Sequence, residues 1–244
     1  MENLIKQRRR MNPVRMELSR ELNKKMISSL CKELHVDKEH VFLTRVPLDM
    51  SFVFGLQGYL RNTAQDKLFY QRRTPRMTPE LDDKSALIPQ IMKKDVLLSY
   101  PFENIRSFIN LLNEAAKDDS VVSIKMTLYR LADKSQIVDA LVEAAENGKE
   151  VVVLVELRAR FDEENNIEWS RRLEDAGCRI IYGIDHIKVH SKLCLITYCD
   201  GTEVKHITQI GTGNYNEQTA KLYTDLSLMT ANQDIAEEAA QVFN

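Results

Sequence analysis

The sequence lacks the features that mark several specialised classes of protein. Its formal net charge is −2 over 244 residues, so it has no global positive field that would attract nucleic acid or an acidic membrane surface. No apolar run approaches the length of a membrane span, and the N-terminal stretch MENLIKQRRRMNPVRMELSR has no signal-peptide core. With 43% hydrophobic and 29% charged residues, the composition is that of an ordinary globular protein.

Cysteine is scarce, and its spacing excludes the common zinc motifs. The four cysteines lie at positions 31, 178, 194 and 199 and show no paired metal-ligand spacing. Cys194 and Cys199 fall in or just after an apolar strand pattern, where cysteine acts as a small hydrophobe. We therefore expect a reducing cytoplasm, with the protein either free or attached to a membrane within a larger assembly.

The first part of the chain is irregular. Up to residue 94 we expect a helix over 12–34, a second helix over 49–62, and a proline-rich, charged linker over 70–95. At the other end, the stretch AEEAAQVFN stops inside a helical pattern without a cap or stop signal. This pattern favours a fragment of a longer protein.

After residue 96, strand and helix patterns alternate. Helices are expected over 101–119, 135–149 and 162–177, and strands over 121–129, 150–157 and 178–184. Three further strands follow with short connections, over 189–198, 204–211 and 223–230. The alternation predicts parallel strands covered by helices on both faces, and the last three strands make the sheet mixed. The predicted class is therefore α/β, with a mixed, largely parallel sheet and flanking helices.

Residues suited to phosphate follow the ends of these strands, where ligands bind in such sheets. The five strand ends bring Arg130; Arg158 and Arg160; His190 and Lys192; Gly211, Gly213, Asn214 and Asn216; and Tyr223 and Asp225. Arginine offers a planar fork to phosphate oxygens and lysine a point charge, while glycine lets backbone N–H groups approach closely. Histidine adds a nucleophile or proton carrier that titrates near neutral pH. The set favours a phosphate site.

Each residue also has a plainer interpretation. A single arginine is more often a surface ion pair, and the run DEEN supplies acidic partners. Asp162 and Glu163 form a candidate metal pair, but acids in the first turn of a helix are the simpler account. GTGN alone is a tight turn that is too short for a P-loop, and His186 and His206 fit satisfied core histidines. The convergence of five strand ends nevertheless favours the phosphate site.

The spacing between His190 and Lys192 narrows the class of reaction that the sequence predicts. His190 and Lys192 are two residues apart, so on a strand they point to the same face. His-x-Lys followed by a small-residue turn, here residues 211–214, is similar to the pattern of the phospholipase D superfamily. That superfamily has aspartate where this chain has Thr197. The resemblance implies a histidine that attacks phosphorus, in a pocket built from two half-sites of which this chain holds one.

Longer stretches, over 124–177, 188–196 and 210–230, resemble the bacterial polyphosphate kinase that works through a phosphohistidine. The resemblance implies that residues 1–94 are the C-terminal part of an α+β head domain plus a linker. It implies that residues 95–244 are the first phospholipase D-like catalytic domain, with the second catalytic domain absent. The implied reaction is reversible transfer of the γ-phosphate of ATP to the end of a polyphosphate chain.

The same resemblance implies a role for each site residue. His190 is the phosphorylated nucleophile, and Lys192 and Asn214 bind phosphate. Arg130 and Arg160 belong to the magnesium and phosphate site, where arginine binds the metal-bound phosphate because it has no acceptor for the metal. Tyr223 contacts the nucleotide. The sequence departs from many relatives at Gln209, where they carry histidine, and we assign no catalytic part to His206.

The implied cofactor is Mg²⁺, and the implied partners are polyphosphate, ATP or ADP, and further copies of the full-length enzyme, without nucleic acid. Two alternatives stay open. One is a phospholipase D-like phosphodiesterase or nuclease half-site, and the other is a catalytically incomplete polyphosphate-binding fragment. Thr197 in the aspartate position favours phosphoryl transfer, since one less negative charge would face the polyanion.

Overall fold

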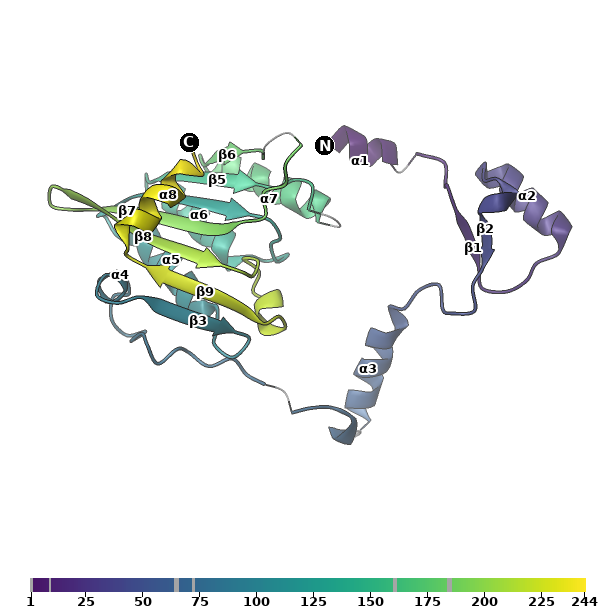
Figure 1. The fold of residues 1–244 in the computed structure, drawn as a ribbon, viewed down its shortest axis with the longest axis horizontal. Helices are drawn as coiled ribbons and strands as arrows, with labels where there is room; N and C mark the ends of the chain where they lie inside the picture. Colours follow the sequence, from purple (N-terminus) through teal and green to yellow (C-terminus); the bar gives the residue numbers. More distant parts are fainter. Residues whose placement is uncertain (1, 9, 64–65, 72, 160–161, 184–185) are drawn as a thin grey trace. The chain divides into compact units, whose positions relative to one another are not determined.

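The computed structural model describes residues 2–8, 10–63, 66–71, 73–159, 162–183 and 186–244. The chain divides into two units, Met1–Arg72 and Arg73–Asn244 (Figure 1). Among the described residues, no helix has the length and apolar character needed to cross a membrane.

The first unit pairs two short strands and contains three α-helices among its described residues. Its elements are α1 (Glu2–Arg8), β1 (Met16–Leu18), α2 (Lys24–Leu34), β2 (Val41–Leu43) and α3 (Phe52–Asn62). The helix expected over 12–34 begins only at α2, because Asn23 caps it by accepting from the Met26 N–H at 2.8 Å. Residues 16–18 instead form β1, which pairs in parallel with β2. The second expected helix is confirmed as α3.

The second unit contains the elements that position the candidate site. They are α4 (Ile88–Ile91), β3 (Val96–Tyr100), α5 (Arg106–Lys117), β4 (Val121–Leu128), α6 (Gln136–Glu146), β5 (Glu150–Val155), α7 (Glu163–Asp175), β6 (Arg179–Ile181), β7 (Lys192–Asp200), β8 (Glu203–Gly211), β9 (Asp225–Thr230) and α8 (Gln233–Gln241). Within the described residues its strands form one seven-stranded sheet in the order β3-β9-β8-β7-β4-β5-β6. The helices and strands expected after residue 96 are confirmed, and β3 is an addition.

The sheet is mixed, as the sequence predicts. In the described part of the chain, β3, β4, β5, β6 and β8 run one way and β7 and β9 the other, so five of seven strands share a direction. Parallel neighbours are confined to β4-β5-β6, and the other pairings are antiparallel. The carboxyl ends of β4, β5 and β8 therefore lie at the same edge as the amino ends of β7 and β9.

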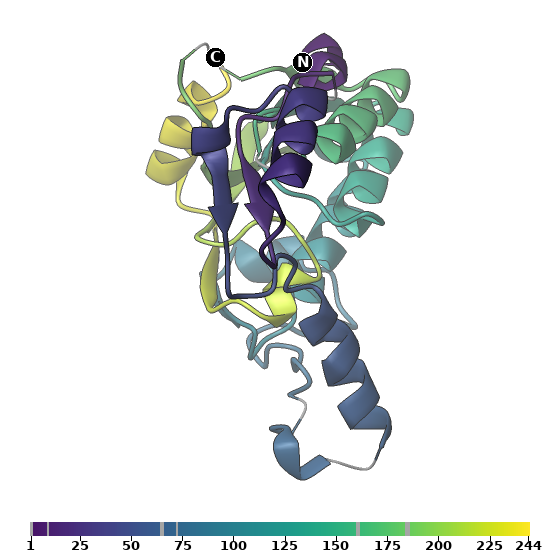
Figure 2. The same ribbon diagram turned by 90° about the vertical axis from the view of Figure 1, so that its right-hand side faces the viewer.

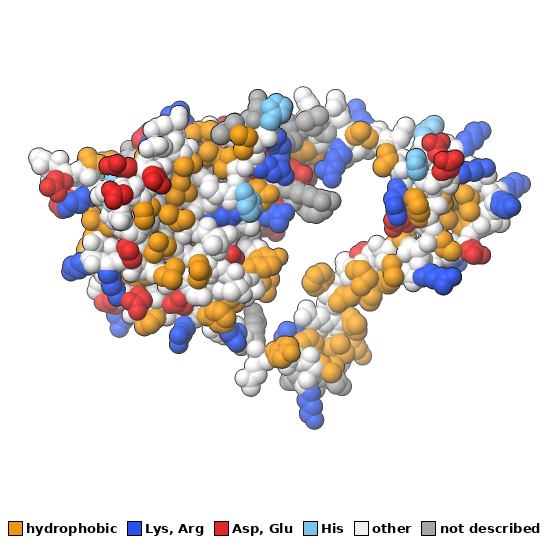
Figure 3. All heavy atoms as spheres, viewed as in Figure 1, with side chains coloured by type: hydrophobic (Ala, Val, Ile, Leu, Met, Phe, Trp, Pro, Cys, Tyr) orange, Lys and Arg blue, Asp and Glu red, His pale blue; other side chains and the backbone are white. Residues whose placement is uncertain are grey.

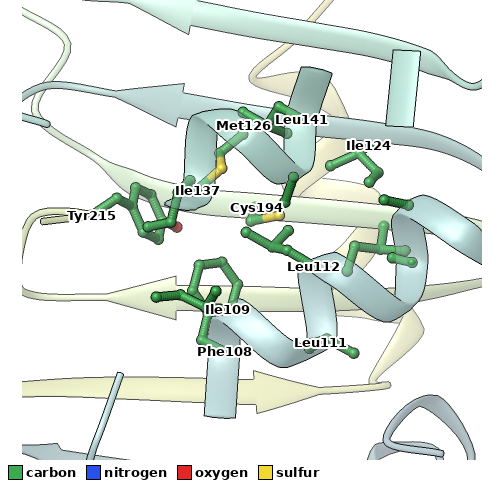
Figure 4. Packing of buried hydrophobic residues seen from close by; sticks show 14 of the residues in the cluster. Phe108, Ile109, Leu111, Leu112, Ile124, Met126, Ile137, Leu141, Cys194 and Tyr215 are labelled. Carbon is green, nitrogen blue, oxygen red and sulfur yellow. The ribbon is translucent and has the colours of Figure 1, made fainter. Parts of the chain in front are cut away.

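The main core lies between the sheet and helices α5 and α6 (Figure 4). Apolar residues at helical spacing, among them Phe108, Leu111 and Ala115, give α5 one fully buried face. Ser135 caps α6 as expected, accepting from the Val138 N–H at 3.4 Å. This layer fixes the position of β4, whose end carries part of the candidate site.

Helix α8 covers the opposite face of the sheet. Its Ala236, Ala239 and Phe243, the last just beyond its end, pack on Leu193 and Leu195 of β7. Figure 2 shows α8, in yellow, on one side of the sheet and the teal and green α6 and α7 on the other. Helices on both faces are thus confirmed.

The segment over 73–94 differs from the linker that the sequence predicts. It folds with the second unit, and Leu81, Leu87, Ile88 and Ile91 are buried in the main core. The carboxylate of Glu114 in α5 anchors it by accepting from the N–H groups of Leu87 and Ile88 at 2.6 and 2.9 Å. The linker prediction was wrong here because the apolar residues of this stretch have no period. The assignment of residues 1–94 and 95–244 to family domains stays a prediction.

Replacing Leu87 with alanine tests whether this segment belongs to the core. Leu87 is 3% exposed, so Leu87→Ala should lower the free energy of unfolding by about 2–5 kcal/mol. Leu97→Ala is the matched control, since Leu97 is 54% exposed and its truncation should change stability by less than about 0.5 kcal/mol. Urea unfolding followed by circular dichroism measures both, and equal stabilities of the two variants would contradict the assignment.

Candidate active site

The sheet topology brings the predicted strand ends together at one edge. Lys192, the first residue of β7, is paired with Gly211 at the end of β8. Met126 of β4 is paired with Cys194, which places the end of β4 beside the start of β7. Figure 3 shows Lys, Arg and His side chains gathered where β5 and β8 terminate. The described strand ends that carry the predicted phosphate-site residues therefore lie at one edge of the sheet, and their binding of phosphate stays a prediction.

His190 lies just before β7 rather than on it. The strand expected to begin at 189 begins at Lys192, so the prediction that His190 and Lys192 share a strand face was wrong. The Lys192 ammonium instead curls back and donates to the His190 carbonyl at 2.5 Å. The His190 side chain is exposed at the edge of the sheet, while Lys192 is buried.

Two buried side chains hold the backbone on either side of His190. On the amino side, Glu156 Oε2 accepts from the Val189 N–H at 2.9 Å. On the carboxyl side, the Thr127 hydroxyl donates to the Ser191 carbonyl at 2.8 Å and accepts from the Leu193 N–H at 3.0 Å. Thr127 is 1% and Glu156 is 2% exposed. The backbone of His190 is thus fixed from β4 and from the end of β5.

One aromatic ring contacts several of the candidate residues. The Tyr129 ring lies edge-to-face with the His190 imidazole, with centroids 4.5 Å apart and planes at 86°. The same ring lies 5.4 Å from the Lys192 ammonium and 5.8 Å from the guanidinium carbon of Arg130. Histidine, lysine and arginine are therefore gathered around Tyr129.

The surroundings favour the neutral form of the His190 imidazole, because they lower its pKa. Partial burial lowers its pKa below the ordinary value of 6.5, and the charges of Lys192, Arg130 and Lys188 lower it further. Burial also lowers the pKa of Lys192, and the nearby Asp225 carboxylate opposes this effect. A neutral imidazole beside several cations can donate its lone pair to an electrophile that carries negative charge.

The arginines take different positions. Arg130 is part of the cluster, and its Nε lies 2.9 Å from Asp162 Oδ2, so the plainer ion-pair interpretation also holds for it. Arg158 donates to the Ile187 carbonyl at 2.6 Å and lies 3.5 Å from Glu156, which makes it a support of the His190 segment. Arg160 lies outside the described residues.

The glycine turn that follows β8 has a steric requirement. A Cβ at Gly213 would approach the Asp225 carboxylate to 2.5 Å, so a side chain there cannot coexist with the present position of Asp225. The Thr212 hydroxyl holds Asp225 Oδ1 at 2.8 Å. Asn214 is half-buried, and its Oδ1 is shielded from solvent without a hydrogen-bond partner among the described residues.

Tyr223 and Gln209 have different surroundings. Tyr223 precedes β9 and is 62% exposed, so its ring is available to a ligand. Gln209 is 3% exposed, accepts from the Tyr215 hydroxyl and donates to Ser227 Oγ at 2.9 Å. It connects β8 to β9 and to the turn, and this packing role explains why the position needs a polar residue.

Thr197 does not face the cluster. It is five residues from Lys192 along β7, which corresponds to about 16 Å and to the opposite face of the strand. Its hydroxyl lies 3.1 Å from His206 Nδ1 on β8. The interpretation that a carboxylate here would face the polyanion was therefore wrong. His206 is half-buried in this contact, and His186 is exposed rather than part of the core.

The described residues contain no group of three or more His, Cys, Asp or Glu side chains placed to hold a metal ion. Asp162 and Glu163 lie at the N-cap and the first turn of α7, as the helix interpretation predicts. The cluster around Tyr129 is made of donors, and arginine and ammonium groups offer no lone pair to a metal.

Sequence reasoning missed Tyr129, Thr127 and Glu156. Glu156 carried a signal, because an acid that closes the apolar run VVVLV is unusual in a buried strand. Tyr129 precedes Arg130 within the stretch over 124–177 that carries the family resemblance, but nothing in the sequence shows which way its ring points. A buried threonine such as Thr127 looks like any other β-branched strand residue.

Comparisons with known proteins match the whole chain. The family description "Polyphosphate kinase C-terminal domain 1" matches residues 86–244, and "Polyphosphate kinase middle domain" matches residues 1–56. The polyphosphate kinase of Staphylococcus haemolyticus is 42% identical over 245 aligned residues, which cover 100% of this chain and 34% of that protein. The Bacillus cereus polyphosphate kinase is 39% identical, with 100% and 35% covered.

The crystal structure of polyphosphate kinase from Porphyromonas gingivalis matches with a TM-score of 0.65 and 40% identity. The match covers 76% of this chain and 31% of that one. The phospholipase D family member Nuc from Salmonella typhimurium also matches, with a TM-score of 0.46 and 17% identity over 62% of this chain. The chain thus spans about a third of the length of the curated relatives it matches. With 86–244 and 1–56 matched to its domains, the chain belongs to the polyphosphate kinase family.

Proposed function

We propose that this chain carries the nucleophile of an ATP:polyphosphate phosphotransferase and that His190 is this nucleophile. The observation that carries the proposal is the placement of the His190 imidazole, with Lys192 and Arg130, around the Tyr129 ring at the edge of the sheet. Burial and the neighbouring cations also lower the pKa of His190. Three features support it together: the fixed backbone of His190, the cations around its ring, and the family to which the chain belongs.

The proposed reaction has two steps. A lone pair of an imidazole nitrogen attacks the γ-phosphorus of ATP in line, the N–P bond forms, and the bond to the bridging oxygen breaks to release ADP. A terminal oxygen of polyphosphate then attacks the same phosphorus, the N–P bond breaks, and the chain is longer by one phosphate. The phosphoramidate is a high-energy linkage, so the steps run backwards to make ATP when ADP is abundant.

The cations lower the barrier in both directions. Arg130 and Lys192 offset the negative charge that repels a nucleophile and accumulates on the equatorial oxygens. The Asn214 turn adds backbone and amide donors, Arg160 adds a further guanidinium, and Tyr223 contacts the nucleotide. Magnesium enters with the phosphates of ATP, so we assign it to the substrate rather than to a protein site.

The complete pocket requires more protein than this chain. Since the chain spans about a third of its relatives' length, we propose that a second catalytic domain faces His190 and completes the site. We propose further that the full-length enzyme is a homo-oligomer. The isolated chain should bind polyphosphate with steep salt dependence, as a cationic site does with a polyanion, and transfer phosphate slowly or not at all.

Replacing His190 with alanine should abolish covalent labelling. When the full-length enzyme is incubated with γ-labelled ATP, it should acquire an acid-labile, base-stable label. The His190→Ala variant should lack this label. His206→Ala is the control and should keep the label, because His206 contacts Thr197 about 16 Å along the strand from Lys192. Label that survives in His190→Ala would refute the assignment. Hydrolysis of a model diester without ATP use would instead favour the phosphodiesterase alternative.

The rate of phosphohistidine formation should fall in acid. The reacting imidazole must be neutral, and its pKa lies below 6.5. The value of kcat/KM should therefore reach a plateau as the pH rises and decrease as the pH falls through this lowered pKa. Rapid-quench labelling over a pH series measures the midpoint, and a midpoint above 6.5 would be inconsistent with a cation-flanked nucleophile.

Arg130→Ala should slow phosphoryl transfer by about a hundredfold or more, because one donor to the developing charge is lost. Arg172→Ala is the matched control, since Arg172 also pairs with an aspartate, Asp139 at 2.7 Å, and also lies over an aromatic ring, Trp169 at 5.3 Å. Loss of the Arg172 side chain should leave the rate of phosphoryl transfer within about twofold of that of the unmodified enzyme. Equal effects of the two substitutions in a single-turnover assay would argue that Arg130 acts only through folding.

A further inference from the structure

The backbone of His190 is fixed, but this alone does not orient its imidazole. Glu156 and Thr127 hold the neighbours Val189 and Ser191, and neither bond involves the His190 side chain. The imidazole is exposed, so its two side-chain torsions need a restraint if a ring nitrogen is to face phosphorus in line.

Tyr129 supplies a contact that can restrain the His190 imidazole. Its ring is half-buried and lies edge-to-face with the imidazole, at a centroid distance of 4.5 Å and an angle of 86°. This is a favoured arrangement of aromatic pairs, and it disfavours rotation of either ring. The backbone of Tyr129 is itself held, because buried Asn166 of α7 donates to the Tyr129 carbonyl at 2.7 Å and to the Glu156 carbonyl at 3.0 Å.

The same ring lies within cation–π range of two charged groups. The Lys192 ammonium is 5.4 Å and the Arg130 guanidinium carbon 5.8 Å from its centroid. Carboxylates also act on these cations, since Asp162 pairs with Arg130 and Asp225 raises the pKa of Lys192. Lys188, on the segment that carries His190, completes the charged groups around the imidazole.

We propose that Tyr129 is a positioning residue, whose ring fixes the plane of the His190 imidazole and keeps Lys192 and Arg130 beside it. This inference rests on the proposed function, in which His190 is the nucleophile. The contact is made by the ring, so phenylalanine should replace tyrosine at this position and an aliphatic residue should not.

The contact itself is tested by NMR on the 244-residue chain with isotope-labelled histidine. The His190 signals are assigned with His190→Ala, and they should be displaced by the ring current of Tyr129. Tyr129→Phe should keep this displacement and Tyr129→Leu should remove it. Tyr182→Leu, which loses an exposed tyrosine bonded to Glu174, should leave the signals unchanged. Unchanged His190 signals in Tyr129→Leu would overturn the proposal, and Tyr129→Met takes its place if the leucine variant fails to fold.

The catalytic consequence is measured on the full-length enzyme. Tyr129→Leu should slow phosphohistidine formation by about ten- to a hundredfold, because the nitrogen no longer faces phosphorus. The ATP concentration that gives half the maximal rate should change by less than about twofold, since a positioning role gives Tyr129 no part in binding the nucleotide. Tyr129→Phe should restore the rate, and a Tyr129→Leu enzyme as fast as the unmodified one would refute the role.

The two proposals fail in different ways. If the unmodified enzyme acquires no label from ATP, the proposed function is wrong, and the NMR comparison still decides whether Tyr129 positions the ring. If the label forms at the same rate without an aromatic residue at position 129, His190 remains the nucleophile and the positioning role is wrong.

Discussion

Because β7 runs antiparallel to β4, its first residue lies beside the last residues of β4, and the candidate site depends on this pairing. An all-parallel sheet would place the start of β7 at the opposite edge. Tyr129 and Arg130 would then be separated from His190 and Lys192 by the length of a strand. The buried hydroxyl of Thr127 reinforces the pairing at this point, since it bonds to backbone groups on both sides of Lys192.

Burial lowers the pKa of both His190 and Lys192, whereas neighbouring charges lower it further for His190 and oppose the effect of burial for Lys192. Both His190 and Lys192 have a lowered pKa because each loses water, and His190 is further affected by neighbouring cations. A lowered pKa favours the unprotonated form of the imidazole relative to a histidine without cationic neighbours. The candidate site thus places a histidine of lowered pKa beside positive charge, as the proposed function requires, although the whole chain is slightly acidic.

The sequence predicted the α/β class, the mixed sheet and the edge where the polar residues gather, because period and strand order determine these features. It did not predict β3 or the buried segment near Leu87, whose apolar residues follow no period. It placed His190 on β7, since apolar neighbours on both sides resemble strand, but Glu156 and Thr127 hold that stretch outside the ladder. The contact between the Tyr129 and His190 rings depends on the direction in which each side chain points. The local sequence does not determine this direction.

The tight approach of Gly213 to Asp225 also limits how this turn can vary among related proteins. The two positions cannot change independently, because any side chain at 213 displaces the carboxylate that opposes the effect of burial on Lys192. Loss of Asp225 would make room at 213 but would leave the buried ammonium less compensated. Positions 192, 213 and 225 should therefore covary. Glycine at 213 leaves room for the Asp225 carboxylate, and this carboxylate offsets part of the effect of burial on the Lys192 ammonium.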